Sequence, residues 1–134
     1  MIKFKKAKKK NLPMLIEYKL LTITPYIKDP KEKLKVIAFT NDFLKSHYEE
    51  FRIIYYYLKP IGIYFINDKE LDTLYIKEKY QKRGIGTKAL KKIKDKIETI
   101  KVRKENDQAI KFYKKNGFSK EETKKEVLIL RKGD

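Results

Sequence analysis

The sequence of 134 residues lacks cysteine and tryptophan and has a single histidine, His47. The absence of cysteine excludes a disulfide scaffold, a thiolate nucleophile and a zinc site with sulfur ligands. One histidine argues against a histidine metal site and a Ser-His-Asp triad, and we assign His47 no catalytic role. No apolar run approaches the roughly 20 residues that cross a bilayer, and no apolar signal segment follows the basic N-terminus. We therefore expect a cytoplasmic protein that does not act at a membrane.

Positive charge dominates the composition. Thirty-five Lys and Arg against 18 Asp and Glu give a formal net charge of +17, and only four of these cations are arginine. Such a surface attracts polyanions, including nucleic acid. The lysines are nevertheless spread along the whole chain, and alanine is scarce, as expected from a coding bias toward A and T. We therefore favour a solvated surface over a dedicated nucleic-acid interface.

The size of the chain suits one domain of about 100–200 residues. Hydrophobic residues make up 41% of the sequence, which supplies a core and argues against disorder. Neither a flexible linker nor an internal repeat divides the sequence. We expect one domain over residues 1–134.

Hydrophobic periodicity predicts a mixed α/β fold. Three β-branched and aromatic runs, at residues 51–58, 61–66 and 71–76, are separated by Lys59-Pro60 and Asn67-Asp68 and predict an antiparallel meander. The other predicted elements are a strand at 1–7, a helix capped by Asn11, a helix at 31–48 that Asn41-Asp42 would divide into two pieces, a helix starting near Gly84, a strand at 98–102, a helix at 106–116 and a strand at 127–130. A seventh strand, at 118–123, is an option. The order β-α-α-β-β-β-α-β-α-β predicts one mostly antiparallel sheet of six or seven strands with four helices.

The segment Gln81-Lys82-Arg83-Gly84-Ile85-Gly86-Thr87 lies between the third run and the next helix. A helix start exposes free N–H groups and a partial positive charge, which together can hold an anion. Gly84 and Gly86 allow a phosphate to approach the main chain closely. Two glycines before a helix also occur in turns that bind nothing. The spacing fits neither the dinucleotide fingerprint nor the nucleoside-triphosphate loop.

A second pattern follows in the helix at 106–116. Asn106 and Tyr113 are seven residues apart, almost two turns, and therefore share one helix face. Ala109 leaves room between them, and Gly117 before Phe118 suits a left-handed helix end. Alone, this pattern is also compatible with an ordinary amphipathic helix, in which Tyr113 is a core residue and Asn106 an N-cap.

Together, the two segments resemble the GNAT N-acetyltransferase superfamily. Gln81 to Gly86 matches its Gln/Arg-x-x-Gly-x-Gly loop, and Asn106 to Phe118 matches its Asn-x-x-Ala-x-x-x-Tyr-x-x-x-Gly-Phe helix. The resemblance is specific over residues 61–118 and only topological before residue 53. One departure is Glu78, where many members have proline.

The resemblance implies an enzyme that transfers an acetyl group from acetyl-CoA to a primary amine, without a metal or a covalent enzyme intermediate. It places the pyrophosphate on the loop that begins at Gln81, mainly on the amides of residues 82–87. It also places the pantetheine arm beside Leu74, Tyr75 and Ile76, lets Asn106 touch that arm, and makes Tyr113 the group that protonates the departing thiolate.

Three questions stay open from the sequence. The base that deprotonates the amine is Glu70, eleven residues before Gln81, or else Asp72 or water; Glu70 is also compatible with a plain surface turn. The acceptor is a small-molecule or peptide amine of unknown identity. An exposed edge strand at 127–130 would permit a homodimer. The alternatives to an acetyltransferase are a basic binding module, for instance for nucleic acid, and an acyl-CoA sensor without turnover.

Overall fold

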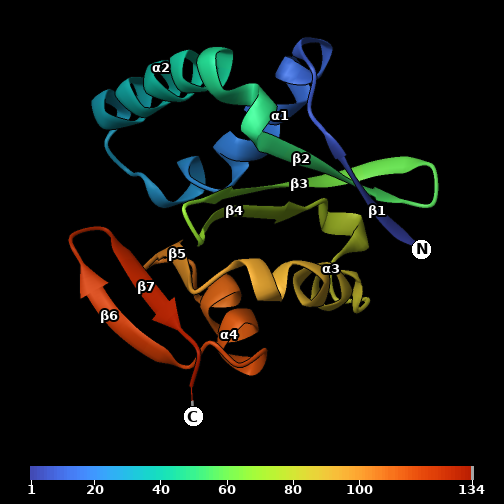
Figure 1. The fold of residues 1–134 in the computed structure, drawn as a ribbon. Helices are drawn as coiled ribbons and strands as arrows, with labels where there is room; N and C mark the ends of the chain where they lie inside the picture. Colours follow the sequence, from blue (N-terminus) through green and yellow to red (C-terminus); the bar gives the residue numbers. More distant parts are fainter. Residues whose placement is uncertain (134) are drawn as a thin grey trace.

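The computed structural model describes residues 1–133 and has one sheet between two helical layers (Figure 1). Its elements are β1 (Ile2–Lys6), α1 (Leu12–Leu21), α2 (Pro30–His47), β2 (Phe51–Tyr56), β3 (Lys59–Asn67), β4 (Glu70–Ile76), α3 (Ile85–Ile93), β5 (Thr99–Arg103), α4 (Asp107–Lys115), β6 (Lys120–Lys124) and β7 (Val127–Arg131). The predicted fold class and element order are confirmed, including the additional strand after α4.

The seven strands lie in the order β1-β2-β3-β4-β5-β7-β6. Only the β4–β5 pair is parallel; the other neighbours are antiparallel. The prediction of an exposed edge at 127–130 was wrong, because β7 lies inside the sheet between β5 and β6. The edge strand at that end is β6, whose five residues are all exposed and mostly charged, as is usual for a sheet edge.

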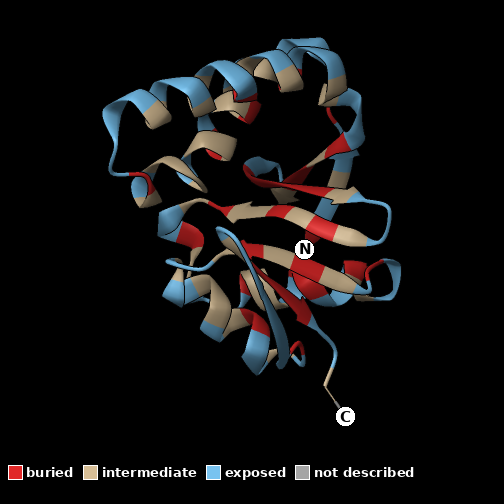
Figure 2. Ribbon diagram, turned by 90° about the vertical axis from the view of Figure 1, so that its left-hand side faces the viewer, coloured by how far each residue is buried: buried red, intermediate tan, exposed pale blue. Residues whose placement is uncertain are grey.

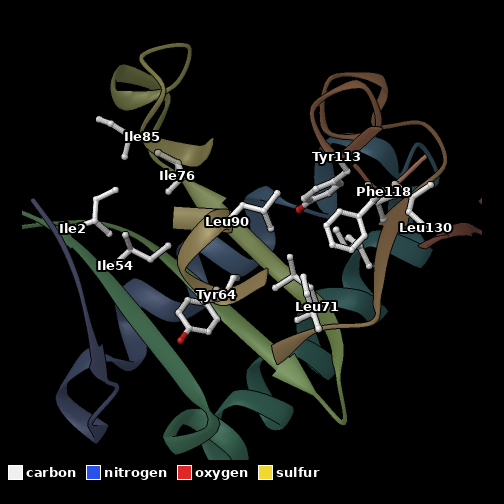
Figure 3. Packing of buried hydrophobic residues seen from close by; sticks show 14 of the residues in the cluster. Ile2, Ile54, Tyr64, Leu71, Ile76, Ile85, Leu90, Tyr113, Phe118 and Leu130 are labelled. Carbon is white, nitrogen blue, oxygen red and sulfur yellow. The ribbon is translucent and has the colours of Figure 1, made fainter. Parts of the chain in front are cut away.

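Two hydrophobic clusters hold the layers together. Helices α1 and α2 cover one face of the sheet, and α3 and α4 cover the other (Figure 1). The first cluster packs Leu15 and Leu44 against Phe51 and Phe65. The second includes Leu90 and lies between the sheet and α3 and α4 (Figure 3). Buried residues therefore concentrate on the strands, whereas the outer surface of α2 is exposed (Figure 2).

Helix α2 runs without interruption through Asn41-Asp42, so the possible division there is not present. Asp29 caps this helix by accepting a hydrogen bond of 3.2 Å from the N–H of Lys31. The ring of Phe43 packs near the rings of Phe51 and Phe65. This tertiary packing outweighs the weak helix propensity of Asn and Asp.

The starts of two other elements also differ from expectation. Asn11 does precede α1, but its side chain accepts a hydrogen bond of 2.8 Å from the N–H of Lys8 instead of capping the helix. The turn between β2 and β3 is formed by Tyr57 and Leu58, with Tyr57 at φ +57°, and not by Lys59-Pro60. Pro60 is accommodated at the start of β3 because the pairing of β3 with β4 begins only at Gly62.

No helix within residues 1–133 is long and apolar enough to span a membrane.

Candidate active site

The central feature of the site is a gap between β4 and β5. Their parallel pairing consists of Glu70 with Thr99 and Leu71 with Ile100 and goes no further. β4 continues to Ile76, paired along its other side with β3. Residues 72–76 therefore have a neighbouring strand on one side only. The stretch predicted to lie beside the pantetheine arm, Leu74, Tyr75 and Ile76, is in this part of β4.

A bulge in β4 marks the point where the gap opens. In the pairing with β3, Ile66 lies opposite Leu71 and Phe65 lies opposite Thr73, which leaves Asp72 without a partner. Beyond the bulge, Leu74 packs with the cluster under α3 and α4, whereas Tyr75 packs with the cluster under α1 and α2. The gap thus starts at Asp72, and the side chain of this residue is not constrained by pairing with β3.

The loop before α3 presents a row of free main-chain amides. Those of residues 82–87 donate no hydrogen bond to any part of the chain that the structure describes. Lys82 and Gly84 both have positive φ, +59° and +78°, a conformation that makes successive N–H groups converge on an anion. The loop therefore fits a pyrophosphate in its donor groups and in its charge, which Lys82, Arg83 and Lys88 supply.

The two loop glycines have different surroundings. A Cβ placed on Gly84 would have no atom within 4 Å, so the space beside this left-handed residue is open. A Cβ on Gly86, in the first turn of α3, would lie 3.4 Å from Cζ of Phe112 on α4. The space beside Gly84 is thus open to a ligand, whereas a Cβ at position 86 would make an ordinary van der Waals contact with Phe112.

Gln81 ties the loop to its surroundings. Its Nε2 donates to the carbonyl of Ile76 at 2.6 Å, and its Oε1 accepts from Nε2 of Gln108 at 3.3 Å. The side chain is thereby occupied by protein contacts and positions the loop. The guanidinium of Arg83 lies 5.5 Å from the ring centre of Tyr80.

Asn106 and Tyr113 lie at opposite ends of α4. Asn106 caps the helix: its Oδ1 accepts a hydrogen bond of 3.2 Å from the N–H of Ala109, as the alternative interpretation expected. Helix α4 ends at Lys115, and just beyond it Gly117 has a φ of +100° and the N–H of Phe118 donates to the carbonyl of Tyr113 at 3.0 Å. This hydrogen bond satisfies the carbonyl of Tyr113 at the end of the helix.

Tyr113 is only 5% exposed and belongs to the cluster under α3 and α4. Its hydroxyl points toward Leu90, away from Phe118 and Leu130 (Figure 3), and has no hydrogen-bond partner among residues 1–133. Burial raises the pKa of the Tyr113 phenol well above its usual value. The phenol is thus a core residue that stays protonated over the whole physiological range.

The two candidate bases have different surroundings. Glu70 lies at the closed end of the gap, where its Oε2 accepts a hydrogen bond of 3.0 Å from the hydroxyl of Thr99. Burial alone would raise the pKa of Asp72, but the charge of Lys19 and the hydrogen bond and charge of Lys101 outweigh it and hold that pKa well below its usual range. A carboxylate so strongly held in its charged form is a poor proton acceptor, so Glu70 is the better candidate.

Lys19 and Lys101 were not singled out in the sequence. They meet at Asp72 from α1 and β5, 53 and 29 residues away along the chain, and no local pattern connects residues so far apart. Within residues 1–133 there is also no cluster of three or more Asp, Glu or His side chains that could hold a metal ion.

The match to a family model decides the classification. The model described as the acetyltransferase (GNAT) domain matches residues 49–120, which is more than half of the chain and includes β4, the loop and α4. The chain belongs to the GNAT family. The resemblance noted in its motifs is thereby confirmed.

Solved structures share this GNAT fold over nearly the whole chain. PaiA N-acetyltransferase from Thermoplasma acidophilum, in complex with coenzyme A, is 24% identical with a TM-score of 0.69, covering 99% of both chains. YjaB from Escherichia coli is 19% identical with a TM-score of 0.73, covering 97% of this chain and 95% of its own. Arabidopsis thaliana Naa50, in complex with the bisubstrate analogue CoA-Ac-MVNAL, is 21% identical with a TM-score of 0.60, covering 99% of both. No curated protein matches the sequence significantly.

Family membership supports acetyl transfer as the general activity of this protein. At these identities the structural neighbours establish the fold alone.

Proposed function

We propose that the protein is an acetyl-CoA-dependent N-acetyltransferase that acts on a primary amine in a ternary complex, with no covalent enzyme intermediate. The observation that carries the proposal is the row of free amides at residues 82–87. It lies at the end of the part of β4 that β5 does not pair. A diphosphate held on these amides would direct the attached arm along residues 74–76 toward Tyr113.

Acetyl-CoA supplies an acetyl group activated as a thioester. In our proposal the loop neutralises the phosphates through its amides and through Lys82, Arg83 and Lys88. The main chain of β4 orients the arm as an added strand would be oriented. Asn106 contributes its amide nitrogen, since its oxygen is already used to cap α4.

The proton movements are assigned to two side chains. The amine nitrogen forms a bond to the acetyl carbon while the carbon–sulfur bond breaks. Tyr113 donates its proton to the departing thiolate, and Glu70, directly or through a water molecule, takes a proton from the amine. Burial raises the pKa of the Tyr113 phenol, so this group begins the reaction protonated.

The test combines calorimetry with a CoA-release assay. We expect the purified protein to bind acetyl-CoA and to release CoA with at least one acceptor in a panel of polyamines, amino acids, aminoglycosides and peptides with free amino termini. Binding without release for any acceptor would favour the acyl-CoA sensor. No heat of binding and no thermal shift at millimolar acetyl-CoA would refute both.

A separate groove favours a second function, the binding of single-stranded nucleic acid. The groove has a volume of about 260 Å³ and is lined by Met1, Lys3, Lys5, Tyr55, Tyr57 and Leu58. Two ammonium groups beside two tyrosine rings, with no acid in the lining, are suited to phosphates and stacked bases. This function predicts retention of single-stranded RNA that falls steeply with salt and is abolished in Lys3→Glu/Lys5→Glu. Absent or salt-insensitive retention would eliminate it.

A further inference from the structure

An ion pair joins β4 and β5 at the first residues beyond their backbone pairing. The last paired residues are Leu71 and Ile100. The next residue on each strand, Asp72 and Lys101, carries a charge, and Nζ of Lys101 lies 2.7 Å from Oδ2 of Asp72. A side-chain contact therefore joins the two strands at the first step of their separation.

A second lysine anchors the same carboxylate to the helical layer. Nζ of Lys19, from α1, donates to Oδ1 of Asp72 at 3.0 Å and to the hydroxyl of Thr73 at 2.7 Å. The hydroxyl of Thr73 in turn donates to Oδ1 of Asp72 at 2.8 Å. The side chains of Lys19 and Asp72 are each 15% exposed, and that of Lys101 is 40% exposed. Both carboxylate oxygens are thus held, one from α1 and Thr73 and the other from β5.

We propose that the Asp72–Lys101 pair, supported by Lys19, fixes the separation of β4 and β5 where the gap begins. The pair would thereby determine the position of the bound thioester in the gap. This inference rests on the function proposed above. The residue without a partner in β3 is the one that carries the carboxylate. The bulge therefore releases Asp72 to bridge three elements. About 13 Å of strand separates Asp72 from the loop end of β4, at roughly 3.3 Å per residue.

Stability alone is a poor explanation for three charges at this place. Removing charges from water costs so much that well-packed apolar side chains of equal size are often as stabilising as a buried ion pair. An ion pair does impose a fixed distance and direction, which apolar packing does not. Fixed geometry matters for the reaction, because a displacement of about 1 Å can slow an enzyme by about 100-fold.

The arrangement also has a consequence for pH. The groups that face Asp72 are Lys19 from α1, Lys101 from β5 and the Thr73 hydroxyl on its own strand, and the two lysines hold the pKa of Asp72 below its usual range. Without Lys101, the burial of Asp72 is opposed by one cation only, and its pKa rises. A fall of kcat at acid pH should therefore begin at higher pH in Lys101→Met than in the parent.

The experiment compares three single variants in the full chain. We expect Lys101→Met to lower kcat at least about tenfold and to leave the Kd for CoA within about twofold, because the phosphate loop is remote. Lys101→Arg keeps a cation and should restore most of the kcat and the parental acid limb. Lys104→Met removes an exposed lysine just beyond β5 and should match the parent. Melting temperatures confirm that each variant is folded.

Two further measurements make the outcome decisive. If Lys101→Met fails to fold, Asp72→Asn/Lys101→Gln replaces the ions by two amides and should show the same loss of kcat. If the parent turns over no amine, the proposed function fails. The readout is then the ratio of the Kd for acetyl-CoA to the Kd for CoA. We expect this ratio to approach one only in the variants that lack the Asp72–Lys101 pair. A parental kcat or parental Kd ratio in Lys101→Met, or an equal loss of kcat and CoA affinity, would overturn the positioning role.

Discussion

The side-chain amide of Gln81 donates a hydrogen bond of 2.6 Å to the main-chain carbonyl of Ile76, the last residue of β4. The same side chain accepts a hydrogen bond from Gln108 in the first turn of α4. One residue thus sets the position of the phosphate loop relative to both the strand and the helix of the site. Pre-organisation of this kind lowers the entropy that a ligand must remove on binding.

We expect Gln81→Ala to weaken CoA binding by up to about 30-fold, because each neutral hydrogen bond contributes about 1 kcal/mol and two are lost. The readout is the Kd for CoA by calorimetry. Gln108→Ala removes only the longer of the two bonds and serves as the graded control. A larger effect in Gln108→Ala than in Gln81→Ala would show that the contact to Ile76 is not the important one.

Gly84 provides a test of the anion cradle with a matched glycine. Both Gly84 and Gly117 have positive φ, so alanine at either position should cost about 1 kcal/mol of stability. Only Gly84 borders the free amides, where the added methyl group would stand in open space. We expect Gly84→Ala to weaken CoA binding at least about tenfold, a loss of about 1.4 kcal/mol, and Gly117→Ala to leave it unchanged. Equal affinities for CoA in Gly84→Ala and Gly117→Ala, with both variants shown to be folded by urea denaturation, would contradict an anion site at this loop.

Tyr113→Phe should separate catalysis from binding. Removal of a general acid costs about 100-fold in rate, whereas the Kd for CoA should stay near the parental value because the ring remains in place. Stability should hardly change, since the hydroxyl has no hydrogen-bond partner among the described residues and is not one of their buried unpaired polar atoms. Tyr64→Phe, at another buried tyrosine of the same cluster, is the control and should keep the parental kcat. If Tyr113→Phe lost as much affinity for CoA as it lost in kcat, Tyr113 would act only through core packing.

The parts of the site that the sequence predicted are the local ones. The loop from Gln81 to Thr87 and the helix from Asn106 to Phe118 are short patterns whose geometry follows from glycine conformation and from helical periodicity. Their neighbours in space were not predictable in the same way. Lys19, Asp72 and Lys101 meet only through the packing of α1 on the sheet and through the bulge in β4.

The errors in the predicted fold have the same origin. Strand β7 was mistaken for an edge because its five residues do not reveal that β6 pairs along its outer side. Helix α2 was given a possible break at Asn41-Asp42 because local propensity does not include the aromatic packing of Phe43. In each case a contact between distant parts of the chain outweighs a local preference.

Glu70→Gln tests the proposed base. The amide oxygen still accepts the hydrogen bond from Thr99, so the strands should remain in register. We expect kcat/KM at neutral pH to fall about 100-fold and the loss to shrink as the pH rises, because more of the acceptor amine is then already neutral. Glu98→Gln, at an exposed glutamate 3.5 Å from Lys69, is the control. An unchanged rate in Glu70→Gln would leave water as the base.

Acid should weaken the fold through Asp72. Lys19 and Lys101 hold the pKa of this carboxyl below its unfolded value of about 3.9. Its contribution to the free energy of unfolding is therefore complete above that value and is lost as the pH falls from about 4 toward the lower folded pKa. Urea denaturation at about pH 7 and about pH 3 should show a smaller loss of stability in Asp72→Asn than in the parent, whereas Asp95→Asn, at an exposed position, should lose as much as the parent. The same loss in Asp72→Asn as in the parent would mean that the two lysines do not depress this pKa in the folded state.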